Sequence, residues 1–102
     1  MKEGFDRIAG ALGDETRRQI LIELLDHNPV APSESVAKNG AQENDEIEMQ
    51  LFHIHLPKLD SMGYISWKKD NGTIAKGPNW KEIEPVVRFL SENRDQLPAD
   101  TF

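Results

Sequence analysis

The chain has 102 residues and no cysteine, which excludes disulfides, thiolate nucleophiles and every cysteine-based zinc site. Its formal net charge of -6 argues against a protein that coats nucleic acid through bulk electrostatics, because such domains are usually basic. No stretch approaches the roughly 18 uninterrupted apolar residues of a membrane helix, and the first residues lack the apolar core of a secretory signal. We therefore expect one soluble, cytoplasmic domain over residues 1–102, since this length is too short for two independent cores.

Two helices are expected at the start of the chain. Apolar residues recur at helical spacing between residues 5 and 12 and stop at Gly13, which suits a short amphipathic helix with a glycine cap. Asp14 suits the N-cap of a second, longer helix that ends before the first proline of the chain. Arg17 and Arg18 lie in its first turn, where a cation meets the unfavourable end of the helix dipole. Either a bound phosphate or a nearby carboxylate such as Asp14 should compensate them.

The middle of the chain predicts a short helix followed by a long one. The short helix covers residues 33–40, begins at a serine cap and ends at an Asn-Gly pair. The long helix covers residues 45–62, with Asp45 and Glu48 spaced as a capping box and Gly63 as its stop.

A hairpin and a last helix complete the chain. The sequence DNG separates two strand-like segments at 64–69 and 73–76, and Asn-Gly is the strongest short signal for a hairpin turn. A helix with a broad apolar face should then cover residues 79–97, and the tail at 98–102 should fray.

This order of elements is that of a winged helix-turn-helix domain, in which the hairpin is the wing and the helix before it reads DNA. The expected fold class is mainly α with a two-stranded β-hairpin wing, with a core over 5–77. The stretches DETRRQILIELL and HLPKLDSMGYISW resemble the opening and the recognition-helix-to-wing junction of ArsR-like transcriptional regulators. The resemblance covers roughly residues 5–97 and is strongest to small haloarchaeal members with an HxHLPKL segment. It implies a homodimer that binds double-stranded DNA.

The long helix divides into a wide apolar arc and a narrow polar face on a helical wheel. Gln50 and His53 lie on the polar face and are the candidate base readers, since Gln pairs bidentately with adenine and His donates to acceptors. The alternative is a solvated acidic face, because carboxylates crowd this helix: Glu43, Asp45, Glu46, Glu48 and Asp60. The apolar arc, expected to face the core, contains Met49, Leu51, Phe52, Ile54, Leu56, Leu59 and Met62.

The histidines of this helix do not predict a joint metal site. His53 and His55 are two residues apart and point roughly 200° away from each other. His55 falls in the apolar arc, so we expect a core histidine, and a zinc site built from His53 with distant carboxylates stays an alternative. Pro57 should bend the helix here, because it has no amide to donate to the carbonyl of His53.

Cations expected to meet DNA lie on three elements. Trp67 of the hairpin is expected in the core, since it alternates in step with Ile65. The alternative for the hairpin lysines is an ordinary charged hairpin that avoids edge pairing. The candidate phosphate contacts are Lys58, Lys68, Lys69, Lys76, Arg17 and Arg18.

The last helix carries more apolar surface than one small core usually consumes, which suggests a partner. Together with the first helix it resembles the dimer interface of ArsR-like proteins. A two-fold dimer would place two reading helices about one DNA turn apart. The expected interface contains Phe5, Ile8, Leu12, Trp80, Ile83, Val86, Phe89 and Leu90.

No catalytic constellation is apparent. The chain has no serine in a nucleophile elbow and no glycine-rich phosphate loop, so we expect neither an enzyme nor a bound cofactor or metal. Our hypothesis is a dimeric transcriptional regulator that reads duplex DNA with helix 45–62 and the wing 64–76. The alternative is a protein-interaction module whose acidic helix binds a basic protein partner.

Overall fold

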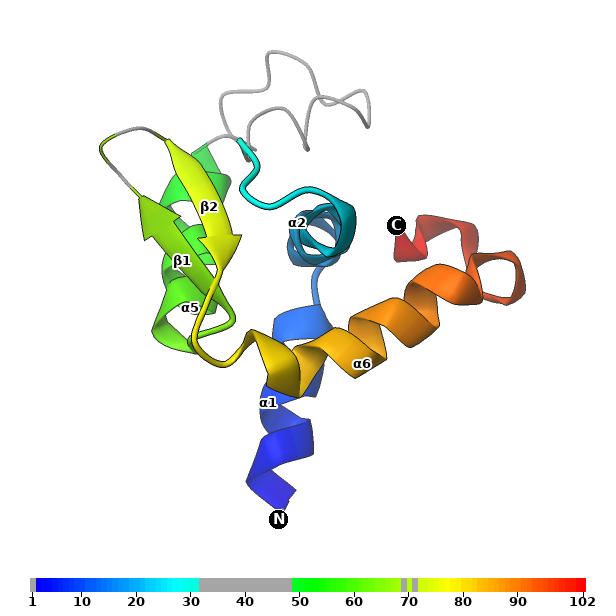
Figure 1. The fold of residues 1–102 in the computed structure, drawn as a ribbon. Coiled ribbons are helices and arrows are strands. Elements are labelled where there is room, and N and C mark those ends of the chain that lie inside the picture. The colour runs from blue at the N-terminus through cyan, green and yellow to red at the C-terminus, as the bar shows by residue number, and fades with distance from the viewer. Residues whose placement is uncertain (1, 32–48, 69, 71) are drawn as a thin grey trace.

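The fold is mainly helical with a two-stranded antiparallel hairpin (Figure 1). The computed structural model describes residues 2–31, 49–68, 70 and 72–102. The short helix expected at 33–40, the carboxylates between 43 and 48, Lys69 and Asn71 lie outside the described residues. In the described ranges no helix is long and apolar enough to cross a membrane. The main elements are α1 (Lys2–Leu12), α2 (Glu15–Asp26), α5 (Leu56–Ser61), β1 (Ile65–Lys68), β2 (Thr73–Lys76) and α6 (Trp80–Glu92).

At the boundary between α1 and α2, Asp14 is the predicted N-cap of α2, whereas Gly13 does not have the positive φ of a glycine C-cap. Asp14 accepts hydrogen bonds from the backbone N–H groups of Thr16 at 2.8 Å and Arg17 at 3.4 Å, which satisfies donors at the start of α2. The N–H of Gly13 donates to the carbonyl of Gly10 at the end of α1. Both predicted helices are confirmed.

The helix before the hairpin contains a π-helical segment, η1 (Leu51–His55), that runs into α5. The N–H of Leu56 donates to the carbonyl of Leu51, five residues back, rather than to the fourth residue back. Pro57 follows at once and has no N–H, so the α-helical ladder is already interrupted at this point. Where the sequence predicted a bend, the structure has this wider turn. Gly63 then ends the helix with a φ of 80°, a conformation that favours glycine.

The hairpin is held to α2 by a third extended segment. β1 and β2 pair antiparallel along their whole length, and Gly72 in the connecting loop has a φ of 70°. Val30, which follows α2, exchanges two backbone hydrogen bonds of 2.9 Å with Ile74 of β2. The chain leaving α2 therefore pairs with the outer edge of β2 and fixes the hairpin relative to α2.

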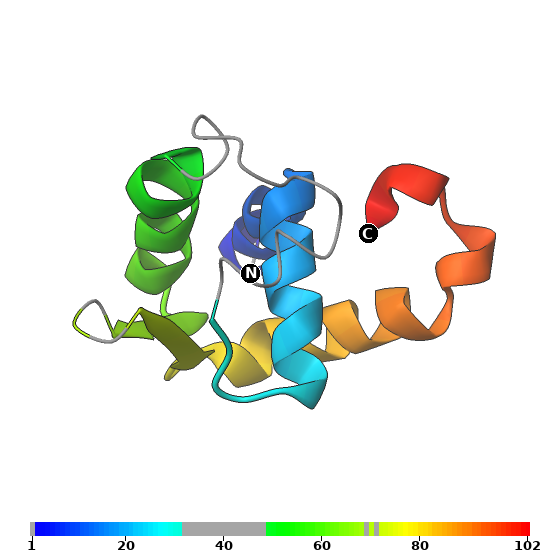
Figure 2. The ribbon, with the colours of Figure 1, turned by 90° about the horizontal axis from the view of Figure 1, so that it is seen from above.

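α2 occupies the centre of the molecule. Figures 1 and 2 place the hairpin and the helix before it at one end of the molecule, and the C-terminal segment on the other side of α2. α6 crosses and packs against α2 (Figures 1 and 2), and α5 packs on β1. One core joins these elements and contains Ile8, Ala11, Ile20, Leu21, Ile22, Leu24, Leu51, Leu56, Leu59, Tyr64, Ile65, Ile74, Trp80, Ile83 and Val87.

The last residues fold back onto α2. A short turn of helix, η3 (Ala99–Thr101), brings two backbone carbonyls to the guanidinium of Arg18, which donates to Thr101 at 2.7 Å and to Asp100 at 3.2 Å. The side chain of Phe102 packs against the core. The prediction of a frayed tail is therefore wrong, because these contacts offset the entropy lost by ordering the segment.

Candidate nucleic-acid interface

Residues 49–61 present one continuous surface to solvent, which we call the outward face. Its exposed residues recur about four positions apart, so that they lie above one another along the helix. The opposite half is buried against the core through Leu51, His55, Leu56 and Leu59. The outward face contains the exposed Met49, Gln50, His53, Ile54 and Lys58, together with the half-buried Pro57, and Asp60 and Ser61 are also exposed at the end of the helix.

The two candidate base readers, Gln50 and His53, are both exposed on the outward face. Two apolar residues that we expected in the core share this face with them. Met49 is 60% exposed and Ile54 is 51% exposed. The reason is that the helix buries only half of its circumference, whereas the predicted apolar arc exceeded half. These apolar members of the face were missed by the sequence analysis.

Two contacts of Trp67 attach the hairpin to this helix. Its ring stacks on Phe52 with centroids 6.1 Å apart, and its backbone N–H donates to Asp60 at 3.2 Å. Asp60 therefore holds the hairpin and is not simply part of an acidic surface. The side chain of Trp67 is partly buried at the edge of the core, as the alternation along β1 suggested.

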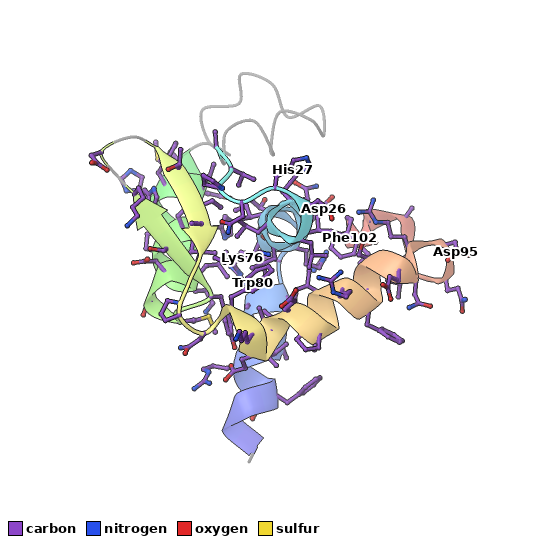
Figure 3. All side chains as sticks on the ribbon, viewed as in Figure 1. Asp26, His27, Lys76, Trp80, Asp95 and Phe102 are labelled. Carbon is purple, nitrogen blue, oxygen red and sulfur yellow. The ribbon has the colours of Figure 1, made fainter. Side chains whose placement is uncertain are left out.

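The hairpin lysines have different surroundings. Lys68 is exposed at the end of β1 that leads to the loop, whereas Lys76 pairs with Ile65 at the other end of the ladder. The ammonium of Lys76 lies 5.4 Å from the centroid of the Trp80 ring (Figure 3). This cation–π contact holds Lys76 toward α6 and away from the hairpin loop.

Arg17 and Arg18 are turned toward the C-terminal end of α1. Arg17 donates to the carbonyls of Gly10 and Ala11 at 3.0 Å, and Arg18 donates to that of Leu12 at 2.7 Å. Carbonyls at a helix C-terminus lack partners within the helix and carry the negative end of its dipole. Carbonyls of α1, and for Arg18 also those of the C-terminal segment, thus accept from these guanidinium groups, whereas Asp14, the carboxylate that we expected, caps α2. Neither guanidinium belongs to the outward face.

His55 is a buried polar residue, as the sequence predicted. Arg17 donates to its Nδ1 at 3.0 Å, and its Nε2 lies 3.6 Å from Oδ1 of Asp14. Burial is the main cause that lowers the pKa of His55, Asp14 raises this pKa, and Arg17 lowers it further. In the described part of the chain, no three His, Cys, Asp or Glu side chains come together as metal ligands.

The residues expected at a dimer interface differ in burial and fall into three groups. Ile8 of α1 and Trp80 and Ile83 of α6 are buried in the core of the single chain, because both helices pack onto α2 with that side. Their assignment to an interface is therefore wrong. Phe5 is 66% exposed and Phe89 is 64% exposed. Leu12, Val86 and Leu90 form the third group and are half-buried.

A network that the sequence analysis missed ties α1 to α6. The buried hydroxyl of Tyr64 donates to Glu82 of α6, and Arg7 of α1 donates to the same carboxylate, through Nε at 3.2 Å and through Nη2. The Tyr64 hydroxyl and then Arg7 lower the pKa of Glu82, because both favour the carboxylate. No motif marks these residues, since they are distant in the sequence.

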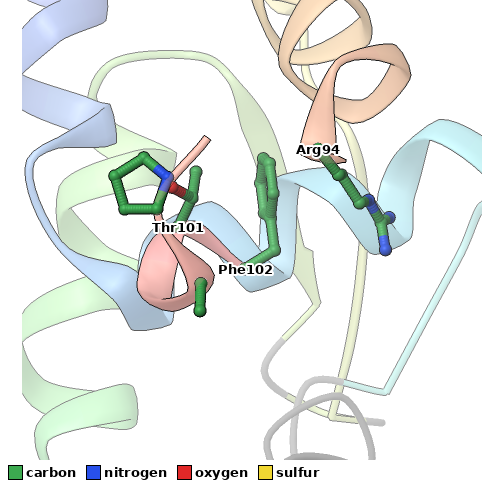
Figure 4. Close-up of a pocket in the computed structure, with 5 residues that line it drawn as sticks. Arg94, Thr101 and Phe102 are labelled. Carbon is green, nitrogen blue, oxygen red and sulfur yellow. The ribbon is translucent and has the colours of Figure 1, made fainter. Parts of the chain in front are cut away.

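A small surface pocket lies beside the C-terminal segment (Figure 4). Its lining consists of Arg94, Pro98, Ala99, Thr101 and Phe102, and the Arg94 guanidinium stands 5.4 Å from the centroid of the Phe102 ring. The segment that forms it is on the far side of α2 from the outward face (Figure 2). The pocket is therefore separate from the candidate interface.

Comparison of the chain with protein-family models, with curated proteins and with solved structures found no match.

Proposed function

We propose that this chain is a winged helix-turn-helix protein of the ArsR-like type that binds duplex DNA as a homodimer and regulates transcription. The observation that carries the proposal is the exposure of Gln50 and His53 on a helix whose other half is buried. A major groove admits one α-helix, and side chains on its outer half reach base edges. The contacts of Trp67 fix the hairpin beside that helix, as the wing of such a domain requires.

The topology supports the same proposal. Val30 pairs with Ile74 of β2, so the segment that follows α2 is attached to the hairpin. The hairpin follows the 49–61 helix after a tight turn at Gly63, so that both lie at one end of the molecule (Figures 1 and 2). A duplex lying across that end would meet the helix and the hairpin together.

Few positive charges lie near the outward face, but they are placed where they can contact phosphate groups. Lys58 lies on the face and Lys68 on the adjacent strand, and both are exposed. The described carboxylate of this helix, Asp60, accepts the Trp67 N–H. Each phosphate contact releases about one counterion from duplex DNA, so the salt dependence of binding should be shallow.

A homodimer is part of the proposal, and the two phenylalanines support it. Phe5 of α1 and Phe89 of α6 expose large apolar side chains, which a partner copy would cover. Figure 1 shows α1 projecting beyond α6, away from the hairpin. A two-fold contact there would leave both outward faces free to enter successive major grooves.

The proposal is tested by selecting bound duplexes from a random pool and measuring their affinity against salt concentration. We expect the Lys58→Ala/Lys68→Ala variant to bind more weakly and to reduce the slope of log affinity against log salt by about 2. Lys81→Ala, which removes an exposed lysine of α6, is the matched control and should bind like wild type. Unchanged affinity and slope in the double variant would remove the hairpin and Lys58 from the mechanism.

The net charge of -6 favours one other candidate, a module of the same shape that binds a basic protein partner. Its acidic residues between 43 and 48 precede the outward face in the sequence. Retention of a basic peptide, with no binding of any duplex at low salt, would support this function and exclude the first.

A further inference from the structure

The outward face alternates apolar with hydrogen-bonding side chains, and this mixture points to a particular base. Met49 and Ile54 expose more than half of their surface beside Gln50 and His53. From this arrangement we infer that Ile54 and Met49 contact thymine methyl groups in the major groove, so that the bound site contains A·T pairs opposite these residues. The inference rests on the proposed DNA-binding function and specifies its ligand.

The chemistry of the groove favours this pairing. The C5-methyl of thymine is the apolar group that a base pair presents in the major groove, and adenine of the same pair presents N6 and N7 to a glutamine. Gln50 and Ile54 are four residues apart, so their side chains are neighbours along the face, about 5–6 Å apart at Cβ. Base pairs are stacked about 3.4 Å apart, so the two side chains reach neighbouring steps.

The shape of Ile54 suits a direct contact. Its branched side chain has a restricted χ1, so it loses little freedom when it is placed against a methyl group. Met49 is longer and unbranched, which lets it adapt to a methyl at the edge of the face. Without a partner, both side chains expose apolar surface to water, which is unfavourable.

The charges around the face favour DNA as the occupant over an apolar protein surface. Lys58 lies one position beyond Pro57 on the same face, and Lys68 lies on the strand that packs beside it. An apolar partner would have to bury or displace these ammonium groups together with His53. A duplex instead offers phosphates along the edges of the groove, which exposed lysines can contact, and methyl groups on its floor.

The test compares thymine with uracil, which lacks only the C5-methyl. Each thymine of a selected duplex is replaced singly by deoxyuridine, and binding is measured by fluorescence anisotropy. Burial of one methyl group corresponds to about fourfold in affinity, so wild type should lose about fourfold at one or more positions. Ile54→Ala should bind the thymine and uracil duplexes equally at the position that Ile54 contacts. Lys58→Ala, the matched control, should weaken both duplexes and preserve their ratio.

Each outcome decides the matter. Wild type that binds duplexes but does not distinguish uracil from thymine at any position overturns the inference and leaves the proposed function standing. The same holds if Ile54→Ala and Met49→Ala both keep the wild-type ratio at every position. If the selection yields no duplex that binds, the proposed function and the inference are both overturned.

Discussion

The guanidinium of Arg17 donates to Nδ1 of His55 across 3.0 Å and thereby joins the start of α2 to the helix that carries the outward face. A guanidinium has only donors, so Nδ1 must be the acceptor and the ring proton must lie on Nε2. Nε2 faces Oδ1 of Asp14 at 3.6 Å, and Asp14 also caps α2. The neutral imidazole therefore fits the site, and a second ring proton would oppose the Arg17 cation.

This arrangement predicts a loss of stability in mild acid. The pKa of His55 is lowered, chiefly by burial, from its ordinary value of 6.5. As pH falls below 6.5 the unfolded chain takes up a proton before the folded chain does, so the free energy of unfolding decreases down to the lowered pKa. Urea denaturation between about pH 7.5 and pH 5 should show this decrease, and His55→Gln should reduce its slope.

A matched control is available on the same helix. His53→Gln makes the same exchange at an exposed histidine and controls for the substitution itself. Equal slopes for wild type and His55→Gln would contradict the lowered pKa of His55 as the cause of the loss of stability in acid.

Two glycines should respond oppositely to alanine. A Cβ at Gly63 would collide with the side-chain amide of Asn79, and the backbone there has a φ of 80°. Gly63→Ala should therefore destabilise the protein by about 2 kcal/mol. Gly10 lies within α1, and a Cβ added there would meet nothing within 4 Å, so Gly10→Ala should stabilise the protein by about 0.5–1 kcal/mol. Denaturant titrations measure both changes, and a neutral Gly63→Ala would contradict the assigned helix stop.

The C-terminal segment should loosen when its aromatic anchor is removed. Phe102 is half-buried against the core, and its removal leaves the carbonyls of Asp100 and Thr101 held by Arg18 alone. We expect Phe102→Ala to cost about 1–2 kcal/mol, less than a fully buried phenylalanine. Hydrogen exchange of the Thr101 amide, which donates to Pro98, should accelerate more than that of α2 amides. Unchanged exchange at Thr101 would refute the anchoring role of Phe102.

The proposed dimer depends on Phe5 and Phe89. Phe5→Glu/Phe89→Glu should give a monomer by light scattering, because it places charges on the surface that a partner would cover. Val86 is unsuitable for this test, since it packs against the core and its replacement would also destabilise the chain. Met49→Glu/Ile54→Glu changes two similarly exposed apolar residues on the outward face and should remain dimeric. A dimeric phenylalanine variant would contradict the interface.

The parts of the fold that the sequence predicted depend on local signals. Asp14 as a cap, Gly63 as a helix stop and the DNG loop each act within a few residues, through backbone geometry that the residue type itself favours. His55 was placed in the core by periodicity alone, because its neighbours in the helix share its burial. These predictions needed no knowledge of distant contacts.

The parts that differ are decided by tertiary contacts. A helical wheel does not show how much of a helix meets the core. Only half of the 49–61 helix does, so the prediction that Ile54 faces the core is wrong. Periodicity also does not tell core from interface, which is why Ile83 was placed between protomers. One partner of Arg18 is the carbonyl of Thr101, 83 residues away, and no local pattern encodes it.

The central claim is that the outward face of the 49–61 helix contacts duplex DNA, and an NMR titration with a selected duplex tests it residue by residue. The account predicts that the amide signals of Gln50, His53, Ile54 and Lys58 shift together with that of Lys68, while those around Phe89 do not. A duplex that leaves these five signals unchanged, or that shifts only signals of α6, would contradict it.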